Sequence, residues 1–286
     1  MTPMLNAQLI KLDDYSSIAF AQAGRGEPVV LVHGSLCDYR YWEPQFVPIS
    51  SINRVLALSL GHYFPTRELN RSLPFSWRVH IQQIIQFIDD IVCEPVHIVA
   101  HSYGAYLVFQ LAHCFPERLR SITLADPSGF IKHSDASSYQ RNTLHTRVIE
   151  LIQQSKIDAG LELFVDSVSQ KGTWARSADR FKIMARDNAH TLWPQILDQV
   201  PVFSEHDARK ILLPVMLVLG EKSPFIFHQN IKWLHKYINN SFKTTIAGVS
   251  HGMNLTHPRA FNQVVLDFIK VNSRTQFSKK VRSTYT

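Results

Sequence analysis

The stretch that decides the fold is residues 96–107, VHIVAHSYGAYL. Val96, Ile98 and Val99 form a short apolar, β-branched run that is typical of a buried strand. The run leads into Ala100-His101-Ser102-Tyr103-Gly104, after which apolar residues recur at helical spacing. A strand, a sharp turn with serine at its apex and a helix form the context of a nucleophile elbow, where small residues let strand and helix approach closely. The simpler alternative is an ordinary strand–helix turn.

Strand patterns recur on both sides of this stretch. The predicted strands cover residues 5–12, 17–23, 29–32, 54–58, 96–100, 121–125, 215–219 and 242–246. Helical spacing follows several of them, whereas only helix-like pieces follow one another from about residue 130 to 207. This alternation predicts an α/β fold with a doubly wound, mainly parallel sheet that is interrupted by a helical insertion.

The composition fits a globular protein with a large core. The chain has 286 residues, of which 45% are hydrophobic and 19% charged, as in ordinary soluble domains. No apolar run is long enough to span a membrane, and the first residues do not resemble a signal peptide. Three cysteines without metal-ligand spacing indicate reduced thiols. We therefore expect a cytoplasmic protein without a membrane span.

The net charge of +7 does not predict nucleic-acid binding, because of where the charges lie. Five cationic residues without an acidic one occur in the Ser/Thr-rich end of the chain: Lys270, Arg274, Lys279, Lys280 and Arg282. Residues 272–286 are therefore interpreted as a solvated basic tail, since chain ends are commonly poorly ordered. Weak contact with an acidic partner is the alternative, and the oligomeric state stays open between monomer and dimer.

Several short motifs, in this order, resemble the α/β-hydrolase superfamily over nearly the whole chain to about residue 271. They are His33-Gly34, Gly61-His62, His101-Ser102-Tyr103-Gly104, Phe115-Pro116-Glu117-Arg118, and Ser250-His251-Gly252 followed by Pro258. The resemblance implies an eight-stranded α/β-hydrolase core formed by residues 1–129 and 208–271. It also implies that residues 130–207, inserted after the sixth strand, form a helical cap over the strand ends.

The same resemblance implies the catalytic roles of two residues. Ser102 is the expected nucleophile, and its weakly acidic hydroxyl needs an adjacent base. His251 fits this role, because it follows the last strand in a loop that can reach back to the elbow. Serine before histidine is also the chain order of this fold. The alternative for His251, one of 14 histidines, is an ordinary loop residue.

The acidic partner departs from the commonest pattern of the superfamily. Relatives often carry an aspartate shortly after the seventh strand, where this chain has Ser223 in Gly220-Glu221-Lys222-Ser223. Other members, haloalkane dehalogenases among them, place the acid at the end of the sixth strand, about 24 residues after the nucleophile. Asp126 stands 24 residues after Ser102. Asp126 is therefore the predicted acid, with a loop-capping role as its alternative and Glu221 as the second candidate.

The resemblance assigns the oxyanion hole to backbone N–H groups of Ser35 and Tyr103, and it leaves His33 a structural role in its loop. Two or three aromatic residues of the cap are expected to face the site, among Phe130, Tyr139, Phe164, Trp174, Phe181, Trp193 and Phe203. No metal-binding or nucleotide-binding motif is present in the sequence, so no cofactor and no metal is expected.

The sequence thus predicts a cofactor-independent serine hydrolase that cleaves a small or medium, mainly apolar carboxylic ester. A carbon–carbon bond hydrolase, a perhydrolase or an acyltransferase would use the same residues, since the fold does not fix the reaction. The alternative from another class is a ligand-binding protein that keeps the fold but lacks activity. The serine at position 223 motivates that alternative.

Overall fold

The computed structural model describes residues 6–70, 72–131, 135–198 and 201–273. Its centre is an eight-stranded sheet with the strand order β1-β2-β4-β3-β5-β6-β7-β8. Strand β2 pairs antiparallel with β1 and β4, and all other neighbours pair in parallel. The predicted α/β fold with a mainly parallel sheet is confirmed. The basic tail predicted for residues 272–286 lies, from residue 274 onward, outside the described residues.

All eight predicted strands are present within a few residues of the expected bounds. They are β1 (Gln8–Lys11), β2 (Ser17–Ala23), β3 (Pro28–Val32), β4 (Arg54–Ser59), β5 (Val96–His101), β6 (Leu119–Ala125), β7 (Val215–Gly220) and β8 (Ser241–Ile246). The helices that accompany the sheet are α1 (Glu43–Ser50), α2 (Trp77–Phe87), α3 (Tyr103–Cys114), α9 (Glu205–Lys210), α10 (Phe225–Tyr237), α11 (Met253–Thr256) and α12 (Pro258–Val271).

The two faces of the sheet are covered by different helices. Alternate strand residues such as Val30, Val32 and Ile98 pack with α2, α3 and α10 in one cluster. Their neighbours in sequence, such as Val29 and Val99, pack with α1 and α12 in a second cluster. Because successive side chains of a strand point to opposite faces, a run buried throughout is what a sheet covered on both sides requires.

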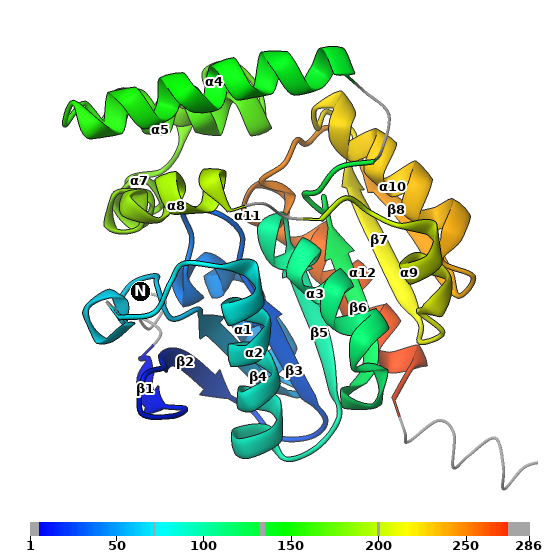
Figure 1. Ribbon diagram of the computed structural model, residues 1–286. Helices are drawn as coiled ribbons and strands as arrows, with labels where there is room; N and C mark the ends of the chain where they lie inside the picture. The colour runs from blue at the N-terminus through cyan, green and yellow to red at the C-terminus, as the bar shows by residue number, and fades with distance from the viewer. Residues whose placement is uncertain (1–5, 71, 132–134, 199–200, 274–286) are drawn as a thin grey trace, which may run out of the picture.

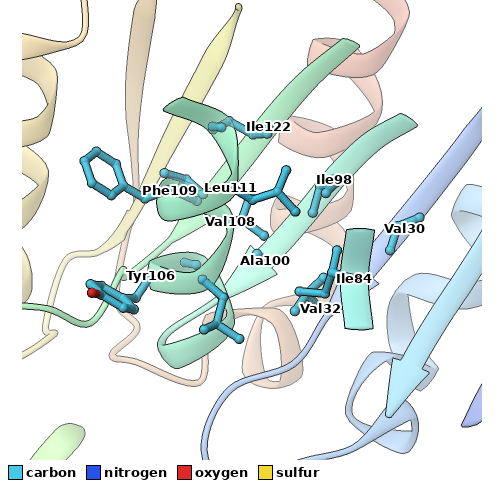
Figure 2. Packing of buried hydrophobic residues seen from close by; sticks show 14 of the residues in the cluster. Val30, Val32, Ile84, Ile98, Ala100, Tyr106, Val108, Phe109, Leu111 and Ile122 are labelled. Carbon is cyan, nitrogen blue, oxygen red and sulfur yellow. The ribbon is translucent and has the colours of Figure 1, made fainter. Parts of the chain in front are cut away.

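The β5–α3 turn lies at the carboxyl end of β5, a central strand of the sheet, and the helix that follows it packs on this strand (Figure 2). Figure 2 shows Val108 and Leu111 of α3 near Ile98 and Ala100 of β5, whereas the ring of Tyr106 points away from this strand. At Gly104 the backbones come so close that a Cβ atom would lie 2.3 Å from the carbonyl oxygen of His33. The turn therefore tolerates no side chain at this position.

The inserted helices lie together above the carboxyl ends of the central strands (Figure 1). They are α4 (Asp135–Gln153), α5 (Ile157–Val168), α6 (Thr173–Arg176), α7 (Asp179–Asp187) and α8 (Leu192–Leu197). Their buried side chains form a separate hydrophobic cluster that includes Leu161, Phe164 and Leu192. Helix α9, which begins at Glu205, lies instead against α3 and α10. Among the described residues, no helix combines the length and the hydrophobicity needed to cross a bilayer.

Candidate active site

Ser102 stands at the apex of the β5–α3 turn in a strained backbone conformation. Its φ of 54° and ψ of −117° lie outside the regions that non-glycine residues favour. Three main-chain hydrogen bonds hold it there: its N–H donates to Ala125, and its carbonyl accepts from Tyr106 and Ser128. Strain of this kind persists only where the surroundings impose it, and it is common at functional sites.

The ring of His251 and the carboxylate of Asp126 meet in the loops after β8 and β6. His251 Nδ1 lies 3.1 Å from Asp126 Oδ2. Because a carboxylate only accepts hydrogen bonds, Nδ1 carries the proton and Nε2 presents its lone pair. Both residues are almost inaccessible to solvent. Ser102 lines the same cavity as His251, but its Oγ makes no hydrogen bond to the ring within the described residues. Such contacts are often long before substrate binds.

Ser223 contacts the Asp126 carboxylate directly. It occupies the position at which relatives often carry an aspartate. Its Oγ donates to Asp126 Oδ2 over 2.5 Å, and the N–H of Gly220 donates to Oδ1 over 3.3 Å. A Cβ atom at Gly220 would lie 2.6 Å from Ser223 Oγ, so the glycine leaves room for this contact. The serine therefore supplies a donor to Asp126 instead of a second carboxylate.

Glu221, the second candidate for the acid, lies apart from His251. Its Oε2 accepts a hydrogen bond of 2.7 Å from the N–H of Gly248, and its side chain is exposed. Among the candidate acids, the structure therefore brings Asp126, and not Glu221, to the ring of His251.

Burial controls the protonation of this pair. It lowers the pKa of the His251 imidazole, which is consequently neutral at neutral pH and able to accept a proton. Burial also raises the pKa of the Asp126 carboxyl, while the hydrogen bonds from Ser223 and Gly220 act in the opposite direction. The two donors thus favour the ionised form that a proton-accepting imidazole needs beside it.

Two rings fix the orientation of His251. Phe227, from α10, stacks on it with the ring centroids 4.3 Å apart. His101, which precedes Ser102, lies 4.4 Å away on ring centroids, and its Nε2 donates to the carbonyl oxygen of His251 over 2.8 Å. His101 Nδ1 faces the hydroxyl of Tyr41 at 3.3 Å. The sequence motifs contain His101 but give no indication of these contacts.

The N–H groups of Ser35 and Tyr103 are the two donors predicted for the oxyanion hole. Tyr103 is the first residue of α3, where helical N–H groups lack partners. Within the described residues, neither N–H makes a hydrogen bond, and Ser35 and Ser102 line the same cavity. His33 supports the loop before Ser35: its Nε2 accepts from the N–H of Leu60 and its Nδ1 donates to the carbonyl of Gly34.

A cavity of about 410 Å³ connects these groups with the inserted helices. Ser102, His251 and Ser35 line it from the sheet side, and residues of α5, α6 and α7 line it from the other side. Of the aromatic residues expected to face the site, Phe164 and Phe181 do so, whereas Trp193 is largely exposed. A volume of this order suits a small organic molecule.

Comparisons with known proteins agree with this architecture. The sequence model described as "Alpha/beta hydrolase family" matches residues 29–264. The chain is 22% identical to bovine monoacylglycerol lipase ABHD6 over 97% of this chain and 86% of that protein. The naproxen esterase structure from Bacillus subtilis superposes with a TM-score of 0.71 at 17% identity, covering 93% of this chain and 92% of the other.

A structure titled bromoperoxidase, from Bacillus anthracis, superposes with a TM-score of 0.77 at 22% identity, over 93% of this chain and 100% of the other. At these identities the structural likeness establishes the fold alone. Two further curated relatives are matched over only 29% and 30% of their own length. The chemistry of this chain therefore depends on the residues of its own site and does not follow from the shared fold.

Proposed function

The chain belongs to the alpha/beta hydrolase family of enzymes, and from this premise we propose that it is a serine hydrolase of small or medium carboxylic esters. One observation carries the proposal: His251, whose Nδ1 lies 3.1 Å from the buried Asp126 carboxylate, lines the same cavity as the strained Ser102. The names of two relatives, a monoacylglycerol lipase and a naproxen esterase, support ester hydrolysis as the reaction.

In the proposed reaction, Ser102 Oγ attacks the ester carbonyl while His251 Nε2 takes the hydroxyl proton. The tetrahedral oxyanion is bound by the N–H groups of Ser35 and Tyr103. Collapse of this intermediate breaks the bond to the alcohol, which leaves with the proton from His251. Water then attacks the acyl-enzyme with His251 again as the base, and the carboxylic acid and Ser102 are released.

Asp126 holds the ring of His251 and stabilises the imidazolium that forms in each step. Ser223 and Gly220 in turn orient the Asp126 carboxylate. The absence of an acid at position 223 was the reason for considering a non-catalytic ligand-binding protein. The hydrogen bond from Ser223 to Asp126 supports the catalytic proposal over that alternative, because the serine then assists an acid that follows the neighbouring strand.

The purified protein is expected to hydrolyse p-nitrophenyl esters with many turnovers, because the proposed mechanism regenerates Ser102 in each cycle. A series from acetate to laurate, followed by release of p-nitrophenol, tests this. We expect a maximum in kcat/KM at short or medium acyl chains, since the cavity holds only about 410 Å³. Binding of the esters without turnover would favour the non-catalytic alternative.

The inserted helices also hold the loop that carries the oxyanion donor Ser35. Gln195 of α8 donates from Nε2 to Ser35 Oγ over 2.6 Å, and its Oε1 accepts from the Tyr63 hydroxyl over 3.1 Å. Leu36, with a φ of 62°, is buried in the hydrophobic cluster of the inserted helices. The position of the Ser35 N–H therefore depends on the packing of these helices.

Gln195→Met and Ser35→Ala are each expected to lower kcat about fivefold to tenfold, less than the 10²–10³ that loss of a whole oxyanion donor costs. KM should change little, because the oxyanion forms only in the transition state. If the two substitutions act by removing the same contact between Gln195 and Ser35, the double variant should be no slower than either single variant. Gln154→Met, in the exposed turn that follows α4, is the control.

The readout is kcat and KM for all variants, with thermal unfolding to exclude loss of fold. Additive losses in the double variant, or losses confined to KM, would show that Gln195 does not act on the oxyanion loop.

A further inference from the structure

The lining of the Ser102 cavity has two chemical characters. Part of it is apolar and includes Phe164, Val168 and Leu255. Another part is polar and comes from the inserted segment between α5 and α7, which contributes Gln170, Thr173 and Arg176, among others. Arg180, in α7, adds a second guanidinium, and none of the described residues that line the cavity is acidic. The cavity therefore presents two guanidinium groups to a bound molecule, and of these only Arg180 lies near a carboxylate, that of Glu43.

Arg176 is held in place by the backbone beside it. Its Nη2 donates to the carbonyl oxygen of Lys171 over 3.3 Å. Gly172 has a φ of 78°, and a Cβ atom there would lie 2.7 Å from Arg176 Nη1. The glycine thus provides both the left-handed turn and the space in which the guanidinium lies.

Three carboxylates of the inserted segment are engaged with other groups. Asp166 accepts hydrogen bonds from the N–H groups of Gly172 and Trp174, which fixes the turn. Asp158 pairs with Arg186, and Asp187 pairs with Arg40. Within the part of the chain that the structure describes, Arg176 has no carboxylate partner.

Arg180 is expected to contribute less than Arg176 to the binding of an anion in this cavity. Its Nη1 lies 3.4 Å from Glu43 Oε2, and its side chain is 68% exposed. Exposed ion pairs of this kind contribute little free energy, so a ligand could exchange for Glu43 at small cost.

We propose that Arg176, assisted by Arg180, binds an anionic oxygen group of the substrate, a carboxylate or a phosphate, at a distance from the ester that is cleaved. Arginine suits this task because its planar guanidinium donates two parallel hydrogen bonds to such groups. The inference rests on the proposed ester hydrolysis. It narrows the substrate class to esters that have an apolar part and an anionic part.

The test compares matched pairs of esters. Mono-p-nitrophenyl glutarate is paired with its methyl ester, which places the anion on the acyl side. An acylated glycerol 3-phosphate is paired with the same acylglycerol, which places it on the alcohol side. The wild-type enzyme is expected to have an about tenfold higher kcat/KM for the anionic member of at least one pair. A preference of this size corresponds to the lower end of the free energy that a hydrogen bond to a charged group contributes. The pair with the larger preference identifies the source of the anion.

Arg176→Gln is expected to abolish this preference by raising KM for the anionic ester alone, because the contact is made equally in ground and transition states. The preference of the wild type should also decrease with added salt. Arg147→Gln, which removes an exposed arginine of α4 paired with Glu150, is the matched control and should keep the preference.

Binding of glutarate itself, measured as protection against thermal unfolding, gives a readout that does not need catalysis. If glutarate protects the wild type but not Arg176→Gln, the anion site is supported even when no ester is hydrolysed. A complete lack of ester hydrolysis would overturn the proposed function and not the anion site. Equal rates for both members of each pair, together with no protection by glutarate, would show that Arg176 is only a solvated surface residue.

Discussion

Ser102→Ala is expected to lower kcat for p-nitrophenyl esters at least about 10⁴-fold, as removal of a catalytic serine does in comparable enzymes. The substitution removes only Oγ and keeps the Cβ atom that packs against Gly34. The variant should therefore fold as the wild type does and still bind esters. Steady-state hydrolysis together with thermal unfolding measures both properties.

Ser250→Ala is the matched control, because Ser250 lines the same cavity and its buried Oγ has no hydrogen-bond partner among the described residues. Its activity should stay within a few fold of the wild type. If Ser102→Ala kept substantial activity while Ser250→Ala lost it, the nucleophile would have been assigned to the wrong serine.

Asp126→Asn is expected to lower kcat by about 10³–10⁴ with little change in KM. The amide keeps the size of the carboxylate but loses its charge, and its NH₂ group can turn toward His251 and impose the wrong tautomer. The lost negative charge also destabilises the imidazolium. The pKa of His251, already lowered by burial, should fall further, so the acid limb of kcat/KM should move to lower pH.

Two variants complete this test. Glu221→Gln should cost far less, because its carboxylate binds the N–H of Gly248 and not His251. Adding Ser223→Asp to Asp126→Asn should recover part of the rate, since Ser223 Oγ already lies 2.5 Å from the Asp126 carboxylate. An Asp126→Asn enzyme with nearly full activity would mean that another residue, first of all Glu221, serves His251.

The features that the sequence predicts well are those set by neighbouring residues. The apolar runs of β3 and β5 indicate strands buried on both faces, and Gly104 marks the close approach at the elbow. The pairing of Asp126 with His251 follows from a spacing of 24 residues that fits one known arrangement of the acid. The first two signals are local, and the third depends on residues that follow parallel strands of one sheet.

Contacts that depend on tertiary packing are not visible in the sequence. Gln195 meets Ser35 across 160 residues, and no periodicity marks either residue as a partner. Helical spacing in the inserted segment indicates amphipathic helices, but it does not tell which aromatic side chains face the cavity and which pack among themselves. Phe164 faces it, while Trp174 packs mainly in the cluster of the inserted helices. Ser223 could be located from the motif, but its role as a donor to Asp126 required the geometry.

The most direct test of the central claim is to identify the residue that a fluorophosphonate modifies. The wild-type protein would be titrated with the reagent, and the loss of esterase activity compared with the modified residue found by peptide mass spectrometry. We predict one adduct per chain, on Ser102, that forms in proportion to the loss of activity and slows strongly in Asp126→Asn. Inactivation through an adduct on another residue, or full ester turnover with Ser102 unmodified at saturating reagent, would contradict the proposed mechanism.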